Sequence, residues 1–401
     1  MARSVFILNF ILGGGGDHAL GNKIKDLVIN MGANGMLMTC QGSVRCLKVI
    51  GKVKFGQKPI DYANPILIVA PYSLISSEDL PSIIRQFNNV YEFTSDTIIM
   101  IDEMDSSRDI NDYDINYKTA ILPLKFKSIV MHSLGFLQKS IGYFPMPDSE
   151  VIRITQNSKT EIIKCLDSYN LSLPYSCDLY LAYLSSSSVI TSAYTFIINT
   201  LIEDRDRKNN SVYLLVVRED NQIPAFINRL KYLLPDKKYI NLFSRCDFST
   251  LHDSEHLNIR GSTSGKGEKT IHICMTKSMP INMFKNFTHR CHKGMMSGDQ
   301  SLSDYISLKH HLPYYDKQPW KDPLAKGLFE QAKKQGGPTL LEKIESLIVG
   351  RNGQDTEVMA RILDPGYVQT QSQKNDLKEF NHTVYSKQAD QKIKEILLKY
   401  L

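Results

Sequence analysis

Long hydrophobic runs are missing from this sequence of 401 residues. The N-terminal stretch Ser4–Leu12 is only nine residues long and then meets four glycines, whereas a membrane-spanning helix needs about 20 apolar residues. A single Arg precedes this stretch and no small-residue cleavage pattern follows it, so we do not interpret it as a signal peptide. We therefore expect no membrane span and a cytoplasmic protein. Export through another signal, as for a bacterial effector, stays open.

Paired cysteines and concentrated charge are also missing. The seven cysteines are odd in number and lack regular spacing, which favours a reducing compartment. His289, Cys291 and His292 lie close in sequence, but this spacing is poor for zinc, so we expect no metal site. The net charge of +6 is spread along the chain. It does not indicate a nucleic-acid partner, and it suits an anionic small ligand such as a nucleotide.

The length predicts two domains, because one hydrophobic core rarely serves so long a chain. In the first, the apolar run Val5–Leu12 is typical of a parallel strand buried on both faces. The glycine-rich segment Gly13–Gly16, a helical pattern closed by Gly32 and a second strand at Met36–Cys40 complete a βαβ unit. Its glycine-rich loop should lie at the ligand-binding end of the sheet. The loop does not match the dinucleotide pattern, because His18 stands at the sixth position.

The pattern restarts at Asp178 with a strand at Leu179–Leu184, a serine-rich turn at 185–188 and a helical pattern. Hydroxyl and N–H groups at this helix start are a candidate diphosphate site. We also predict a strand at Tyr239–Phe243 and a mobile polar loop at 245–269. The alternation of strands and helices predicts doubly wound sheets. The predicted divisions are an N-terminal domain at 1–174, a C-terminal domain at 175–350 and a helical tail at 351–401.

The most informative stretch is Met295–Tyr315, which predicts a short strand, a tight turn, a helix and another strand. Gly298 permits the turn, and Asp299 is a good N-cap for the helix. A turn of this kind directs free N–H groups and the positive end of the helix at one point, which suits a phosphate. The Asp299 carboxylate would instead accept hydrogen bonds from sugar hydroxyls, so the pair suggests a nucleotide. An ordinary capped helix is the alternative.

Gly298-Asp299-Gln300-Ser301 and the Pro-Tyr-Tyr strand that follows resemble the donor-nucleotide motif of two-domain GT-B glycosyltransferases. The nearest resemblance is to bacterial protein-arginine rhamnosyltransferases, and a more distant one is to O-GlcNAc transferases. The rhamnosyltransferases have two adjacent acids before the serine, whereas the second position here is Gln300. The segment Gly15-Gly16-Asp17 resembles the N-terminal loop of the same enzymes, in which the Asp is the general base. The resemblance implies two Rossmann-like domains that face a cleft, with the acceptor on the N-terminal side.

The activity implied is an inverting, metal-independent transfer of a sugar from a nucleotide-sugar donor to an acceptor, for which a protein is one candidate. No cofactor is expected. Asp17 is the candidate base, with a helix N-cap as its alternative role. Asp105 and His132 are acceptor-side candidates, although a loop acid and a core histidine are the plainer interpretations. The candidate donor-binding residues are Gly15, Gly16, Tyr183, Ser185, Ser186, Ser187, Arg245, Gly298, Asp299, Gln300, Ser301 and Ser303.

Two other functions fit the same sequence. A nucleotide-sugar epimerase would use the same fold and donor, and a catalytically inactive GT-B scaffold would bind a protein partner. Retained binding of a nucleoside diphosphate would separate an enzyme from a scaffold. Transfer of labelled sugar onto protein would separate a transferase from an epimerase.

Overall fold

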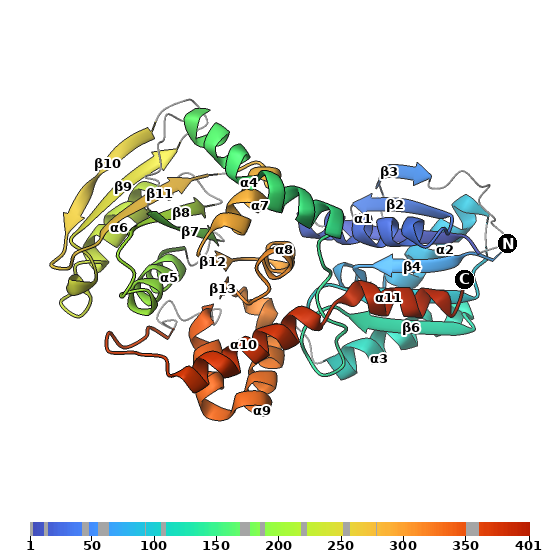
Figure 1. Cartoon of the computed structure of the whole chain (residues 1–401). Helices are drawn as coiled ribbons and strands as arrows, with labels where there is room; N and C mark the ends of the chain where they lie inside the picture. Colours follow the sequence, from blue (N-terminus) through green and yellow to red (C-terminus); the bar gives the residue numbers. More distant parts are fainter. Residues whose placement is uncertain are drawn as a thin grey trace. The chain divides into compact units, whose positions relative to one another are not determined.

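The computed structural model describes residues 3–11, 15–41, 48–54, 64–92, 94–105, 110–168, 177–184, 189–217, 223–251, 257–277, 279–349 and 361–401. Two compact α/β units make up the chain (Figure 1). Unit 1 comprises Met1–Pro145, Trp320–Leu328 and Ser386–Leu401, and unit 2 comprises Met146–Pro319 and Phe329–Tyr385. The predicted pair of doubly wound α/β domains is thereby confirmed.

Unit 1 is built on a six-stranded sheet with the order β3-β2-β1-β4-β5-β6. All neighbouring pairs are parallel except β2 and β3, which are antiparallel. The strands are β1 (Val5–Ile11), β2 (Gly35–Gln41), β3 (Lys48–Lys54), β4 (Ile66–Ala70), β5 (Thr97–Asp102) and β6 (Ser128–Ser133). The helices are α1 (Gly15–Asn30), α2 (Leu80–Tyr91), α3 (Ile110–Ile121) and α11 (Ala389–Leu398).

The core of unit 1 explains why its central strands could be recognised. Strand β1 lies between β2 and β4, and six of its seven residues are buried. All five residues of β4 are buried as well. Both faces of these strands are covered, so nearly every position is apolar. Gly32, at a φ of 72°, follows α1 in the left-handed conformation that glycine adopts without strain.

Unit 2 is built on an eight-stranded sheet with the order β10-β9-β11-β8-β7-β12-β13-β14. The strands are β7 (Cys177–Leu184), β8 (Asn210–Val217), β9 (Arg245–Leu251), β10 (Leu257–Ser264), β11 (Thr270–Thr276), β12 (Lys293–Met296), β13 (Tyr314–Asp316) and β14 (Ile348–Val349). The helices are α4 (Asp148–Ser168), α5 (Val189–Glu203), α6 (Ile223–Leu233), α7 (Ile281–Arg290), α8 (Asp299–Lys309), α9 (Asp322–Leu347) and α10 (Gln371–Ser386). Helix α9 begins in unit 1 and is broken by non-helical backbone at Gly336 and Gly337.

Two local predictions in unit 2 were wrong. Much of the expected mobile loop at 245–269 is the antiparallel pair β9 and β10, whose connecting residues 252–256 lie outside the described part of the chain. The expected strand at Tyr239–Phe243 is instead a 3₁₀ turn at Ile240–Leu242. The true strand therefore starts at Arg245, after the predicted one has ended.

The unit limits also differ from the predicted 1–174, 175–350 and 351–401. Helix α4 belongs to unit 2 because its polar side chains bind α7: Glu150 accepts a hydrogen bond from Lys285, and Glu161 accepts one from Asn286. The predicted tail is divided, because α10 lies in unit 2 up to Tyr385 whereas α11 completes unit 1.

The return of the chain to unit 1 is fixed by backbone hydrogen bonds. The Tyr143 N–H donates to the Lys387 carbonyl at 3.0 Å, and the Ala389 N–H donates to the Tyr143 carbonyl at 2.8 Å. The Lys321 ammonium, whose side chain is 4% exposed, donates to the Met104 carbonyl at 2.8 Å. Segments from three parts of the sequence thus form one unit. Within the described residues, no helix combines the length and the apolar character that crossing a membrane requires.

Candidate functional site

The sheet of unit 2 has a topological switch point between β7 and β12. These strands are adjacent and parallel, but the chain leaves β7 through α5 toward β8 and leaves β12 through α8 toward β13, on the other side. Right-handed crossovers place the two helices on opposite faces of the sheet. The carboxyl ends of such a strand pair form the crevice in which open α/β sheets bind ligands.

The turn after β12 has a conformation that only glycine adopts readily. Gly298 has a φ of 95° and a ψ of 157°, a region that costs other residues about 1–3 kcal/mol. Within the described part of the chain, no atom other than those of Gly298 and its two chain neighbours lies within 4 Å of the point where a Cβ of Gly298 would stand. Gly298 itself is the N-cap residue of α8 and Asp299 is the first helical residue, which corrects the predicted cap by one position. The N–H groups of the first turn lie at the positive end of the helix dipole, so the start of α8 suits an anionic group.

The side chains of the α8 first turn have distinct roles. The Ser301 hydroxyl donates to the Ser297 carbonyl at 2.8 Å and to the Gly298 carbonyl at 3.0 Å, which holds the turn closed. The Gln300 amide nitrogen donates to the Asp304 carboxylate at 2.5 Å. Ser303 is 3% exposed and lies in the helix interior, away from the first turn. The structure thus brings Gly298, Asp299, Gln300 and Ser301 together at the turn and leaves Ser303 out.

Three polar residues that the sequence did not indicate also lie at this edge of the sheet. Asp316, at the carboxyl end of β13, is fully buried and accepts a hydrogen bond from the Ser192 hydroxyl of α5 at 2.5 Å. The Gln318 amide nitrogen donates to the Ser297 hydroxyl, directly before Gly298, at 3.2 Å. Asp316 and Gln318 could have been recognised from the sequence, because they follow the buried Tyr-Tyr pair at the end of a strand. The Asp316 contact ties β13 to α5, and the Gln318 contact ties the segment after β13 to the end of β12.

The other predicted donor residues divide by position. Ser185, Ser186 and Ser187 follow β7 directly but lie outside the described residues. The Tyr183 ring, near the end of β7, contacts the Phe284 ring of α7 with their centroids 5.8 Å apart.

Arg245 is not brought to the candidate site. It is the first residue of β9, which runs parallel to β11, so it lies at the amino edge of the sheet. Its side chain is 62% exposed and binds Asp247 at 2.7 Å. A site at the carboxyl ends of the same sheet therefore lies at the opposite edge from this guanidinium group.

Unit 1 has its own switch point between β1 and β4. The chain leaves β1 toward β2 on one side and β4 toward β5 on the other, so a crevice is expected at their carboxyl ends. Gly15, Gly16 and Asp17 form the first turn of α1, directly after β1, and their side-chain surroundings lie outside the described part. Since the helix begins at Gly15, Asp17 is not its N-cap residue.

Asp105, an acceptor-side candidate, is bound by its own loop. It is 1% exposed, and its carboxylate accepts hydrogen bonds from the Phe136 N–H at 2.6 Å, the Leu137 N–H at 3.2 Å and the Ser140 hydroxyl at 2.5 Å. Burial raises the pKa of Asp105 above its ordinary value, against the effect of these hydrogen bonds. The arrangement holds the 134–142 loop in place.

His132, the other acceptor-side candidate, lies on the edge strand β6 and is half-buried. Burial lowers the pKa of His132, and the nearby Lys392 lowers it further. Three charged groups act on His132: Lys392 and Lys399, from the C-terminal part of unit 1, lower its pKa, whereas Asp114 raises it. The ring is thus held mostly neutral near physiological pH.

The amino edge of the unit 2 sheet holds a cluster of buried charges. The Lys293 ammonium lies 2.7 Å from Glu203 and 2.9 Å from Asp204, and Glu203 also binds Lys343 and the Tyr314 hydroxyl. Burial alone would raise the pKa of Glu203, but the ammonium groups of Lys343 and Lys293 lower it to about 2. His292, considered above for zinc, faces Asp204 with its Nε2 at 3.3 Å from the carboxylate.

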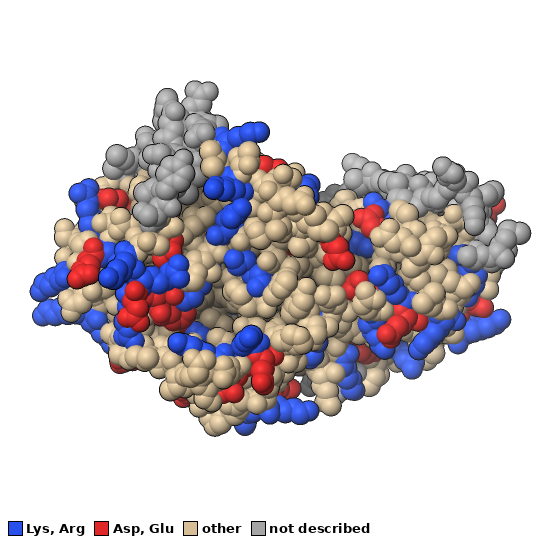
Figure 2. All heavy atoms as spheres, in the orientation of Figure 1, with Lys and Arg blue, Asp and Glu red and all other residues tan. Residues whose placement is uncertain are grey.

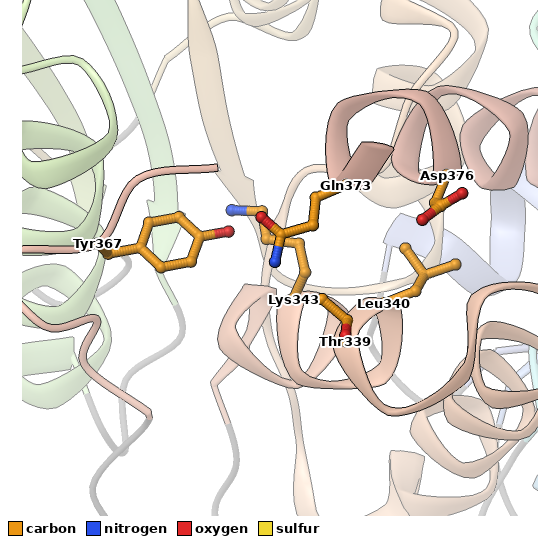
Figure 3. A pocket seen from close by; sticks show the side chains of 6 residues that line it. All are labelled: Thr339, Leu340, Lys343, Tyr367, Gln373 and Asp376. Carbon is orange, nitrogen blue, oxygen red and sulfur yellow. The ribbon is translucent and has the colours of Figure 1, made fainter. Parts of the chain in front are cut away.

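A small pocket borders this charged cluster. Figure 3 shows Lys343, Tyr367 and Gln373 pointing toward one another. The pocket is lined by Thr339, Leu340, Lys343, Tyr367, Gln373 and Asp376. Because Lys343 is bound to Glu203 at the amino edge, the pocket is distinct from the Gly298 turn. Figure 2 shows basic and acidic residues interspersed over the visible face, with no large area of one sign.

No family model and no curated protein matches this sequence. Among solved structures, it is similar to a UDP-forming α,α-trehalose-phosphate synthase from Burkholderia vietnamiensis, with 10% identity over 100% of both chains and a TM-score of 0.46. It is also similar to the protein of a structure on EarP-mediated arginine glycosylation of translation elongation factor EF-P, with 10% identity over 99% of both chains and a TM-score of 0.44. A UDP-GlcNAc 2-epimerase from Neisseria meningitidis bound to UDP-GlcNAc has 10% identity over 99% of this chain and 100% of its own, with a TM-score of 0.37.

Proposed function

We propose that the chain is a glycosyltransferase that takes a sugar from a nucleotide-sugar donor. The observation that carries the proposal is the Gly298 turn at the β7–β12 switch point, because a glycine-specific backbone and the start of a helix coincide there. A diphosphate suits this arrangement. The motif resemblance at residues 298–301 supports a nucleotide that carries a sugar.

The proposed chemistry divides between the two units. In unit 2, the N–H groups of the first α8 turn would stabilise the charge that develops on the departing nucleoside diphosphate. In unit 1, the Asp17 carboxylate would remove the proton of the acceptor nucleophile. A base that activates the acceptor opposite the leaving group gives inversion at the anomeric carbon. Since Arg245 lies at the other edge, the proposed leaving-group site relies on backbone and hydroxyl groups without it.

The test is a thermal-shift screen of the full chain against UDP-glucose, GDP-mannose, dTDP-rhamnose and ADP-glucose. A ligand at 100 times its dissociation constant should add about 2.7 kcal/mol to the free energy of unfolding. A stabilising donor is then supplied with its sugar labelled. Incorporation into protein or another acceptor indicates a transferase, change of the free donor alone indicates an epimerase, and binding without turnover indicates a scaffold. Absence of stabilisation by all four donors would contradict the proposal.

A further inference from the structure

Within the described part of the chain, only one of the two amide ends of Gln300 has a hydrogen-bond partner. Its nitrogen donates to Asp304, one helical turn later, at 2.5 Å. An ionised carboxylate can only accept hydrogen bonds, so the atom facing it must be the amide nitrogen. The Gln300 oxygen is therefore the end left for another partner, and it lies on a half-buried residue in the first turn of α8.

Asp304 is itself held by a chain of charges across three helices. Its carboxylate lies 3.8 Å from the Lys285 ammonium of α7, and Lys285 lies 2.8 Å from Glu150 of α4. The side chains of Asp304 and Lys285 are only 6% and 12% exposed. Burying charges is costly even when they are paired, and apolar side chains of similar size would often serve stability as well. Fixing the orientation of Gln300 is a function that apolar side chains could not provide.

We infer that Asp304 is a positioning residue, which acts through Gln300 to present a neutral hydrogen-bond acceptor to a hydroxyl group of the bound nucleotide-sugar. This inference rests on the proposed function. The orientation matters because the reversed amide would present N–H groups, which suit phosphate oxygens rather than hydroxyls. An amide oxygen also avoids adding a second negative charge beside a diphosphate. Asp304 would thus help the site distinguish sugar hydroxyls from phosphate.

The test is a double-mutant cycle on Gln300→Ala and Asp304→Asn. It uses the donor that stabilises the parent most in the four-ligand screen, with its dissociation constant measured by calorimetry. Asn at 304 keeps the size of the side chain but can donate as well as accept, so it no longer fixes the Gln300 amide. Each single variant should bind about 3- to 10-fold more weakly, the range for loss of one hydrogen bond. The double variant should bind no more weakly than Gln300→Ala alone, because Asp304 acts only through Gln300.

Glu161→Gln is the matched control, since Glu161 binds Asn286 of α7 and Arg153 of its own helix α4, and the donor affinity of this variant should equal that of the parent. If Asp304→Asn does not fold, Lys285→Gln replaces it in the cycle, because it removes the positive charge beside Asp304. If Asp304→Asn reduces donor affinity by the same factor in the parent and in the Gln300→Ala variant, Asp304 only stabilises the helix. Unchanged affinity in the single variants would also overturn the inference. A parent that binds none of the four donors would instead refute the proposed function and this inference with it.

Discussion

The four residues of β12 run from one kind of polar environment to another. At the amino edge, Lys293 places its ammonium within hydrogen-bond distance of two carboxylates, those of Glu203 and Asp204. At the carboxyl edge, the same strand leads to Gly298, where backbone N–H groups begin a helix beside open space. Charged side chains pair with one another at the first edge, whereas the second edge presents the start of a helix at a glycine-specific turn. We therefore expect mutations at the amino edge to reduce stability and mutations at the carboxyl edge to reduce donor binding. The two effects should be separable.

The largest effect is expected at the carboxyl edge of the unit 1 sheet, which adds a third edge to the comparison. Asp17→Asn should reduce sugar transfer by about 10²–10⁴-fold, because the amide keeps the shape but cannot accept the proton. Donor binding should be unchanged. Turnover at saturating donor is the measurement, and Asp26→Asn on the exposed part of the same helix is the control. Full activity of the Asp17→Asn variant would show that Asp17 is not the base and has a structural role.

The next effect concerns the amino edge. Glu203→Gln should lower the free energy of unfolding by about 3–5 kcal/mol, because it leaves the Lys343 and Lys293 charges without their shared carboxylate. Urea denaturation measures this loss. The fraction that stays folded should bind the donor as the parent does. Reduced affinity with little change in stability would reverse the assignment of the two edges.

A smaller effect is expected from Gly298→Ala at the carboxyl edge. The substitution forces alanine into a backbone region that costs about 1–3 kcal/mol, and any relaxation moves the N–H groups of the turn. Donor affinity should fall in calorimetric titrations. Gly32→Ala is the matched control, since this glycine also has a positive φ and open space around it, but it lies at the end of α1. That variant should lose stability and keep its affinity.

The smallest effect is a pH dependence with opposite signs at two buried acids. Glu203 has its pKa lowered from 4.5 to about 2, so its contribution to stability is present above pH 4.5 and is lost as the pH falls toward 2. Asp105 has its pKa raised above 3.8, so its contribution is present below that value and is lost as the pH rises through the folded-state pKa. Calorimetric melting between pH 2.5 and about 7 gives the free energy of unfolding of parent and variant. For Glu203→Gln, the amount by which the parent is more stable than the variant should shrink on acidification. For Asp105→Asn, the stability of the parent relative to the variant should increase on acidification.

Much of the fold was predictable because its central strands are buried on both faces. Val5–Ile11 and Ile66–Ala70 are nearly continuous apolar runs, and the glycine at position 298 marked the turn before α8. The β9–β10 pair was not predictable in the same way. Strand β10 lies at the edge of the sheet and contains Gly261 and several hydroxyl residues, a composition that also suits a surface loop.

The error at Arg245 has a specific cause. A strand predicted at Tyr239–Phe243 puts Arg245 after its carboxyl end, where ligands bind, whereas the actual strand begins at Arg245 and puts it at the amino edge. A shift of a few residues in one strand therefore reverses the edge to which a side chain belongs. Contacts such as Gln318 with Ser297, or Asp304 with Lys285, depend on how separate segments meet, which periodicity along one segment does not show.

The interleaved course of the chain has a consequence for how the protein is made. Unit 1 begins before unit 2 along the chain, yet it needs Lys321 and the α11 helix, which follow most or all of unit 2 in the sequence. Unit 2 lies almost entirely between these parts in the sequence. During synthesis, the first strands of unit 1 must wait for α11 until all of unit 2 has been made, so unit 2 can be completed earlier. The usual order, in which the N-terminal domain finishes folding first, is thus reversed.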